Sequence, residues 1–271
     1  MSIEFSPCSS VNRQRTAGVL SRATRASGLA LAGAAALALA NQPLQAQAAG
    51  KGFLFNSPVG SFTLRGGYAL ANAASDVFSD ATTQLTLDKR DFSSISYGGD
   101  IAYSVKPRID LIVDASVSAT HKDSEFRHFI DNNDEPIEQS TKYRRVPLTF
   151  GMRYYLTDRG RSVGQFAYIP SKYAPYVGVG AGAMYYHFEQ EGDFVDFKDF
   201  GVFPAKLVST GWTPMAHGSA GLDYSVGPWL ALTGEARYQW ARAQLDQDVF
   251  VGYDKIDLSG VTGTVGFKVR F

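Results

Sequence analysis

Three residues of the sequence could together activate a hydroxyl nucleophile. His217 and Ser219 are two positions apart, so they share one face of an extended strand, and Glu235 follows in the next alternating segment. A histidine between a hydroxyl and a carboxylate is the basis of covalent hydrolysis. The His-x-Ser spacing is common by chance, however, and no further hydrolase motif surrounds it. We therefore expect no enzyme, with hydrolysis as the alternative.

Other residues that could form a catalytic or metal site are sparse. The chain has four His and one Cys, and Cys8 lies close to the N-terminus. His121 and His128 fall in a polar segment and show no zinc-ligand spacing. The glycine-rich stretch 178–182 alternates as a strand does and opens no helix, so it predicts no nucleotide-binding loop. We expect neither a metal nor a cofactor.

Alternation of apolar and polar residues organises most of the chain. It occurs at period two, which indicates strands and not helices. The alternating segments are 61–70, 95–105, 110–119, 145–156, 216–226, 230–240 and 261–271, and a glycine-rich segment at 173–186 is an eighth strand whose facing stays ambiguous in the sequence. Soluble strands average about 5–6 residues, whereas a tilted strand needs about 9–11 residues to cross a membrane. The lengths of these segments therefore favour a bilayer over a soluble sandwich.

Aromatic residues and connection lengths support the same interpretation. Tyrosine, tryptophan or phenylalanine ends many of the apolar faces, as in the interfacial girdles of membrane barrels; a sandwich core is the alternative. The turns at 106–108 and 227–228 are short, and the links 72–93, 121–142, 187–212 and 242–257 are long. Long outer loops that alternate with short inner turns are typical of an up-and-down barrel. The long link 157–172 is an exception to this rule.

The predicted fold is all-β, an eight-stranded antiparallel up-and-down transmembrane β-barrel with long extracellular loops. An unpaired backbone group costs several kcal/mol in lipid, so the sheet must close and leave no edge. Equal numbers of basic and acidic residues, 26 of each, exclude a strongly basic nucleic-acid binder. The hydrophobic fraction of 45% argues against disorder.

The first 48 residues have the three parts of an export signal. Four arginines against a single acid precede an apolar run at 28–40, which is too short to span a bilayer. Ala46-Gln47-Ala48 then provides a small-residue cleavage site. We predict a cleaved signal peptide at 1–48 and one barrel domain at 49–271; a buried Ala-rich helix is the alternative interpretation of the apolar run.

Nine charged residues lie on the polar faces of the predicted strands, which would point into the barrel. They are Arg65, Asp100, Asp114, Arg145, Arg153, Asp223, Glu235, Arg237 and Lys268. Eight strands enclose a space just wide enough for side chains or one small ligand. Isolated buried charges are costly, so we expect these residues to pair. The main interpretation is a salt-bridge plug in the lumen, and a narrow polar conduit is the alternative.

Four stretches in this order carry a family resemblance. They read VPLTFGMRYY from Val146, YVGVGAG from Tyr176, EARY from Glu235 and GFKVRF up to Phe271. With the predicted signal peptide, the chain resembles the small eight-stranded outer-membrane barrels of the OmpA, OmpW and OmpX type over about 55–271. The resemblance implies an outer-membrane location in a Gram-negative bacterium, contact with outer-membrane lipids and lipopolysaccharide, and no nucleic-acid partner. We also expect a monomer.

The C-terminal strand is the sharpest single motif. Val265, Phe267, Val269 and Phe271 alternate and end the sequence. The ending is similar to the signal that barrel-assembly machinery reads in the family, and such an edge strand can pair with another sheet edge through its backbone. An ordinary last strand is the alternative.

The long link 187–212 is rich in aromatic residues among acidic ones. Phe194, Phe197, Phe200 and Trp212 form a possible ligand loop, because exposed aromatic residues in quantity can mark a binding surface. Packing on the rim of extended strands is the alternative. The leading functional interpretation is a structural, envelope-integrity protein of the outer membrane. A narrow channel for small or hydrophobic solutes and a surface adhesin are the other two.

Overall fold

A computed structural model describes residues 53–130, 135–164, 166–195 and 201–271. The predicted signal peptide and Cys8 lie outside these residues. The barrel strands are β2 (Gly60–Ala71), β3 (Ser94–Lys106), β4 (Ile109–Ile130), β5 (Pro136–Tyr155), β8 (Tyr173–Val195), β9 (Val202–Ser225), β10 (Leu230–Gln244) and β12 (Gly260–Arg270). No helix in the described ranges is long and apolar enough to cross a membrane.

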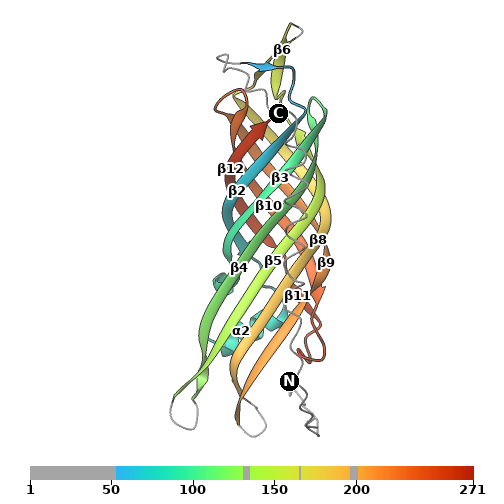
Figure 1. Cartoon of the computed structure of the whole chain (residues 1–271). Coiled ribbons are helices and arrows are strands. Elements are labelled where there is room, and N and C mark those ends of the chain that lie inside the picture. Colours follow the sequence, from blue (N-terminus) through green and yellow to red (C-terminus); the bar gives the residue numbers. More distant parts are fainter. Residues whose placement is uncertain (1–52, 131–134, 165, 196–200) are drawn as a thin grey trace, which may run out of the picture. The chain divides into compact units, whose positions relative to one another are not determined.

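The eight strands form a closed antiparallel ring, as the sequence predicts. Each strand pairs with its neighbours in chain order, and β12 pairs with β2 over Gly260–Arg270 to close the sheet. Figure 1 shows the strands tilted around one barrel axis, with the C-terminus at one end. This end carries the short turns, and we call it the periplasmic end. The opposite end carries the long connections and is the extracellular end.

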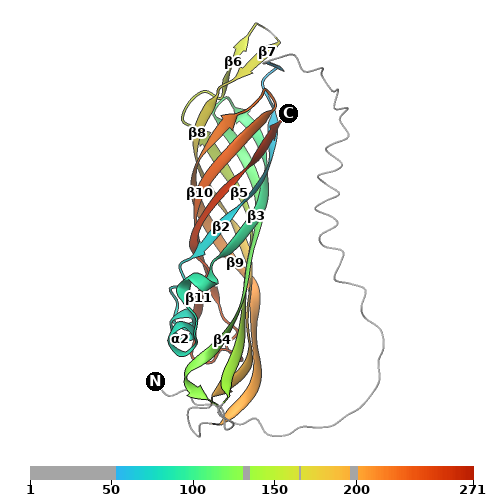
Figure 2. The ribbon, with the colours of Figure 1, turned by 90° about the vertical axis from the view of Figure 1, so that its left-hand side faces the viewer.

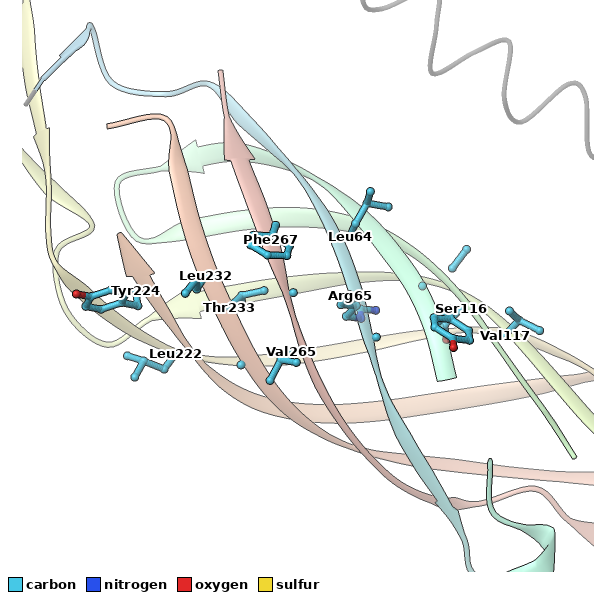
Figure 3. Close-up of a pocket in the computed structure, with 16 residues that line it drawn as sticks. Leu64, Arg65, Ser116, Val117, Leu222, Tyr224, Leu232, Thr233, Val265 and Phe267 are labelled. Carbon is cyan, nitrogen blue, oxygen red and sulfur yellow. The ribbon is translucent and has the colours of Figure 1, made fainter. Parts of the chain in front are cut away.

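The outer surface of the barrel is apolar and fringed by aromatic residues. Leu64, Tyr97, Val265 and Phe267 are exposed there, with Val265 exposed by 72%. These residues, with others, line a shallow depression of about 1050 Å³ on the sheet (Figure 3). A closed barrel with such a surface is solvated by lipid, because water would leave the apolar band unburied.

Four strands continue well beyond the apolar band, which corrects the prediction of loops at 121–142 and 187–212. The strands β4, β5, β8 and β9 are 22, 20, 23 and 24 residues long. Figure 2 shows them reaching past the other strands at the extracellular end. Alternation persists in this extension, but there the outward face is polar, and the inward face carries buried aromatic residues such as Tyr143 and Phe188 beside buried polar ones such as Gln139 and Thr141. We call this part of β4, β5, β8 and β9 the extracellular extension.

The extracellular extension encloses a hydrophobic core. The helix α2 (Asp76–Gln84), the 3₁₀ helix η2 (Lys89–Phe92) and the strand β11 (Lys255–Asp257) supply the other side of this core. Phe78 of α2 is fully buried, with its ring centroid 5.5 Å from that of Tyr143 and 5.8 Å from that of Phe188. The predicted loops 72–93 and 242–257 are therefore packed elements that cover the extension.

The unexplained link 157–172 closes the periplasmic end. It forms a hairpin of β6 (Gly160–Val163) and β7 (Ala167–Pro170), and β1 (Leu54–Phe55) pairs with β7. Before the hairpin, Arg159 donates hydrogen bonds of 2.8 and 3.0 Å to the two carboxylate oxygens of Asp110. Its guanidinium also lies 4.9 Å from the ring centroid of Tyr155. The link therefore places an arginine at the mouth of the lumen, against β3, β4 and β5.

Candidate functional site

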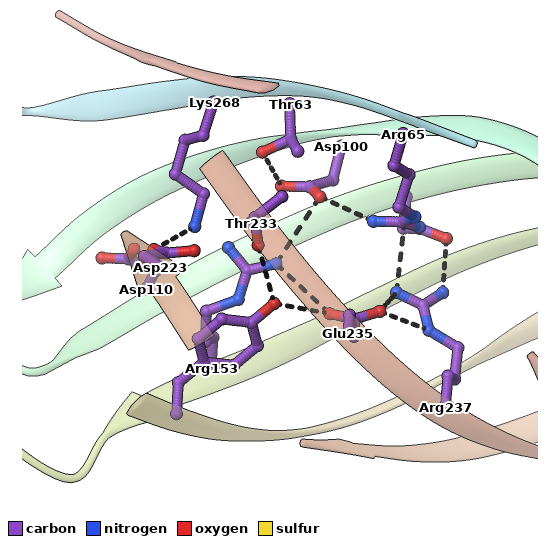
Figure 4. A network of polar contacts seen from close by, with 12 residues as sticks. Thr63, Arg65, Asp100, Asp110, Arg153, Asp223, Thr233, Glu235, Arg237 and Lys268 are labelled. Carbon is purple, nitrogen blue, oxygen red and sulfur yellow. Dashed lines mark hydrogen bonds and ion pairs between the residues drawn. The ribbon is translucent and has the colours of Figure 1, made fainter. Parts of the chain in front are cut away.

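All nine charged residues predicted for the lumen are buried inside the barrel. Their exposed fractions range from 1% for Asp223 and Lys268 to 8% for Arg65. Most of them meet in one network of ion pairs (Figure 4). The strands β2, β3, β4, β5, β9, β10 and β12 each contribute at least one of these residues, and alternation along each strand directs it inward.

Asp114 on β4 lies between Arg65 on β2, two strands away, and Arg237 on β10, on the opposite side of the barrel. Its Oδ1 accepts a hydrogen bond of 2.6 Å from Arg237, and its Oδ2 pairs with Arg65. Arg237 also pairs with Glu235 at 2.8 Å, and Arg65 pairs with Asp100 at 2.7 Å. The carboxylate of Asp114 thus connects β4 to β2 and β10 across the lumen.

Arg153 extends the network toward the periplasmic end. It lies 3.5 Å from the carboxylate of Asp100 and 3.7 Å from that of Glu235. Its guanidinium carbon is 4.5 Å from the ring centroid of Tyr176, which fits a cation–π contact. Tyr176 in turn donates a hydrogen bond of 3.1 Å to Glu235.

A second group lies nearer the periplasmic end. Lys268 pairs with Asp223, and the same carboxylate accepts a hydrogen bond of 3.1 Å from Tyr155. Lys268 Nζ also donates to the Tyr155 hydroxyl at 3.3 Å. The network predicted from the sequence lacks Tyr155 and Tyr176, although Tyr155 lies on the polar face of the segment 145–156. Their rings supply the apolar filling between the charged layers, at 5.7 Å centroid separation.

The charges of the two groups balance. Four cations (Arg65, Arg153, Arg237 and Lys268) face four carboxylates (Asp100, Asp114, Asp223 and Glu235). Desolvated ions are tolerated best when they are paired, and each of these eight charges has an opposite charge beside it. Two atoms of the network, Arg153 Nη1 and Asp223 Oδ1, lack a hydrogen-bond partner among the described residues. The ion pairs Arg153–Glu235 and Arg237–Asp114 connect strands from opposite sides of the barrel.

Arg145 does not join this network. Its guanidinium donates a hydrogen bond of 3.2 Å to the carbonyl oxygen of Leu258 and lies 5.3 Å from the ring centroid of Tyr143. Arg145 therefore lies at the boundary between the charged lumen and the extracellular hydrophobic core. The polar face of the segment 145–156 predicts that Arg145 is buried. It does not predict that Leu258 is the partner of Arg145, because the two residues are distant in sequence.

The possible nucleophile set is not assembled. His217 is buried, and its Nδ1 has no hydrogen-bond partner in the described part of the chain. No hydrogen bond between His217 and Ser219 is present among the described residues, and Glu235 is held by Arg237 and Tyr176. The three residue types share the lumen without the geometry of an activated hydroxyl.

The possible ligand loop is divided between two environments. Phe197 and Phe200 lie outside the described residues. Phe194 stacks on Phe203 at 6.2 Å near the end of the β8–β9 hairpin. Trp212 belongs to β9 and not to a loop; it is 63% exposed and packs on Tyr185 at 5.5 Å. Trp212 is therefore part of the aromatic girdle on the outer surface.

The C-terminal residues face lipid. Val265, Phe267, Val269 and Phe271 are exposed by 37–72% on the outer face. Their strand pairs with β10 and β2, and the Phe271 carbonyl accepts hydrogen bonds from the backbone N–H groups of Val59 and Gly60. The last strand is thus the one that completes the ring.

An ion cluster lies on the outer face of the extracellular extension. Lys142, His187 and Lys206 surround Glu189, whose carboxylate is 2.9, 3.0 and 3.0 Å from their respective nitrogens. Lys206 also pairs with Glu191 at 2.7 Å. Hydrogen bonds to the carboxylate lower the pKa of Glu189 to about 2. The bond from Lys142 has the largest effect, and those from Lys206 and His187 have smaller ones.

Acidification is expected to weaken this cluster. The pKa of Glu189 is lower in the folded state, so its contribution is complete above the ordinary value of 4.5 and is lost as the pH falls toward about 2. Partly exposed pairs are worth about 1 kcal/mol or less. Thermal unfolding of the wild type should therefore lose more stability between these pH values than that of Glu189→Gln. Equal acid sensitivity of the two proteins would contradict this assignment.

Small outer-membrane barrels are among the solved structures to which this chain is similar. OprG, an outer membrane protein of Pseudomonas aeruginosa, matches with a TM-score of 0.45 at 16% identity, over 80% of this chain and 99% of that chain. A major outer membrane protein of Thermus thermophilus matches with a TM-score of 0.42 at 11% identity, over 78% and 99%. Escherichia coli outer membrane protein W matches at 0.36 and 15%, over 80% and 100%.

The fold is that of a small outer-membrane β-barrel. No family model matches the sequence, and no curated protein matches it significantly. With TM-scores below 0.5, these matches carry no argument, and the fold rests on the strand pairing of this chain. The membrane location of this barrel follows from its own closed sheet and apolar exterior.

Proposed function

We propose that this outer-membrane barrel has a structural role in envelope integrity and that its own side chains plug its lumen. The observation that carries the proposal is the continuous filling along the barrel axis. Arg159 lies at the periplasmic mouth, the balanced ion pairs lie in the next part of the lumen, and the hydrophobic core around Phe78 fills the extracellular extension. A solute would have to displace all three.

Energetic considerations favour a plug over a conduit. Opening a path through the network would separate Asp114 from Arg65 and Arg237, and it would leave buried charges without partners. A path through the extracellular extension would expose Phe78 and Phe188, which are fully buried. A barrel of this kind adds a stiff, sealed cylinder to the membrane.

Conductance measurements test the plug. The purified, folded protein in a planar lipid bilayer is expected to give no stable unit conductance, because no continuous aqueous path exists through a filled eight-stranded lumen. A general porin reconstituted in the same way serves as the positive control. Large, stable unit conductance of this protein would overturn the plug.

A measurement of envelope permeability tests the structural role separately from the plug. Cells that lack the protein should take up a hydrophobic dye faster than the parent strain, and the intact gene should restore the barrier. Unchanged dye uptake would contradict the structural role while leaving the plugged lumen intact.

We further propose that the strand ending in Phe271 is the segment that barrel-assembly machinery reads, since it completes the ring.

A further inference from the structure

The outer face of the barrel changes abruptly at the extracellular edge of the aromatic girdle. Val146 lies opposite Tyr185, and Tyr185 lies opposite Trp212. Two residues further toward the extracellular end, Arg144 lies opposite His187. Aromatic belts lie at the level of lipid headgroups. The exposed Arg144 therefore lies at the height of the headgroup phosphates in the outer leaflet.

Arg144 has no partner for its charge among the described residues. Within the described part of the chain, its guanidinium makes neither an ion pair nor a hydrogen bond, in contrast to the buried arginines of the lumen. A guanidinium carries five donors in a planar fork, and this fork binds phosphate oxygens two at a time. Its position and its free donors both indicate an anionic ligand from the surrounding lipid.

Neighbouring cations are held in place beside Arg144. Lys142 is two residues away on the same face of β5, and Glu189 fixes Lys142, His187 and Lys206 at 2.9–3.0 Å. The ammonium of Lys142 has three donors, so some remain free for a ligand. We call Arg144, Lys142, His187 and Lys206 the basic rim. Its three permanent cations exceed the two carboxylates, Glu189 and Glu191, that lie among them.

We propose that the basic rim binds the phosphate groups of lipopolysaccharide in the outer leaflet, with Arg144 as the main contact to a lipid A phosphate. Lipid A combines acyl chains with phosphates at the headgroup level. The girdle of Tyr185 and Trp212 would contact its apolar part, and the basic rim would contact its phosphates. This inference goes beyond the proposed function, because it does not depend on whether the lumen is plugged.

Native mass spectrometry of the full folded protein tests the site with three lipids: bisphosphorylated lipid A, monophosphorylated lipid A and phosphatidylglycerol. Arg144→Gln should weaken binding of bisphosphorylated lipid A roughly tenfold, because a charge-assisted hydrogen bond is lost. Arg161→Gln is the matched control, since Arg161 is exposed on the hairpin at the periplasmic end. Removal of one lipid A phosphate should reduce the difference between wild type and Arg144→Gln.

Several outcomes would overturn the site. Equal affinity of wild type and Arg144→Gln for bisphosphorylated lipid A would do so, as would an equal loss in Arg161→Gln. Equally tight binding of phosphatidylglycerol would identify a non-specific basic surface. Heat-modifiable migration on gels verifies that each variant is folded. Should Arg144→Gln fail to fold, Arg144→Lys keeps the charge and removes the planar fork, and it must also weaken lipid A binding for the proposal to stand.

Discussion

Replacing Asp114 with Asn is expected to lower the free energy of unfolding by about 3–5 kcal/mol, because it breaks a buried ion pair from one side. The carboxylate of Asp114 neutralises Arg65 and Arg237 together. An amide retains the shape but not the charge, so the two guanidiniums would face each other inside the barrel. Equilibrium unfolding by urea in lipid vesicles, followed by tryptophan fluorescence, measures the change.

The chain offers a matched control for this substitution. Asp158 also pairs with an arginine at 2.7 Å, but Asp158 and Arg108 have side chains exposed by 69% and 42%. Asp158→Asn should therefore leave the unfolding midpoint nearly unchanged, because water solvates the arginine that remains. A loss of stability in Asp158→Asn as large as that in Asp114→Asn would show that burial does not set the cost.

A double variant separates the pair from its surroundings. Asp114→Asn combined with Arg237→Gln removes both charges of the 2.6 Å contact, so the combined loss should be smaller than the sum of the two single losses. Additive losses would mean that Asp114 and Arg237 do not interact in the folded barrel.

The sequence predicts the membrane-spanning part well because lipid and lumen make opposite demands on neighbouring residues. A side chain such as Phe267 faces lipid, and Lys268, the next residue, is buried in the lumen. This contrast repeats along most strands, so alternation alone indicates the strands, the facing of most of them and the burial of the charged residues. The glycine-rich segment 173–186 is the exception, because its sequence leaves its facing open. It does not indicate which charges meet, because the partners lie on strands that are distant in sequence.

The same rule fails at the two ends of the barrel. In the extracellular extension the polarity of the two faces is reversed: Phe188 points inward and Glu189 outward. A prediction that looks for apolar outer faces therefore ends β4, β5, β8 and β9 too early. At the periplasmic end, the role of Arg159 depends on Asp110, on another strand, and no local pattern connects the two residues.

The extracellular core gives the other large expected effect. Phe78→Ala should cost about 3–5 kcal/mol, the range for removing a fully buried aromatic side chain. Phe78 contacts three aromatic rings, those of Phe92, Tyr143 and Phe188, at centroid distances of 4.6, 5.5 and 5.8 Å. The loss should fall mainly on the docking of α2, since the ring of barrel strands closes without it.

Limited proteolysis of intact cells distinguishes undocking of α2 from unfolding of the barrel. The segment 72–93 should become sensitive to protease in Phe78→Ala, while the barrel keeps its heat-modifiable migration on gels. Phe203→Ala is the matched control, because Phe203 is 43% exposed near the end of the β8–β9 hairpin and should behave as the wild type. Since α2 is no strand of the barrel sheet, its docking depends mainly on side-chain burial, beside the hydrogen bond from Tyr253 to Asp80. Equal protease resistance of Phe78→Ala and the wild type would show instead that hydrogen bonds hold the segment without Phe78, such as the backbone bond from Thr86 to Glu125 and the bond from the Arg127 side chain to the Leu85 carbonyl.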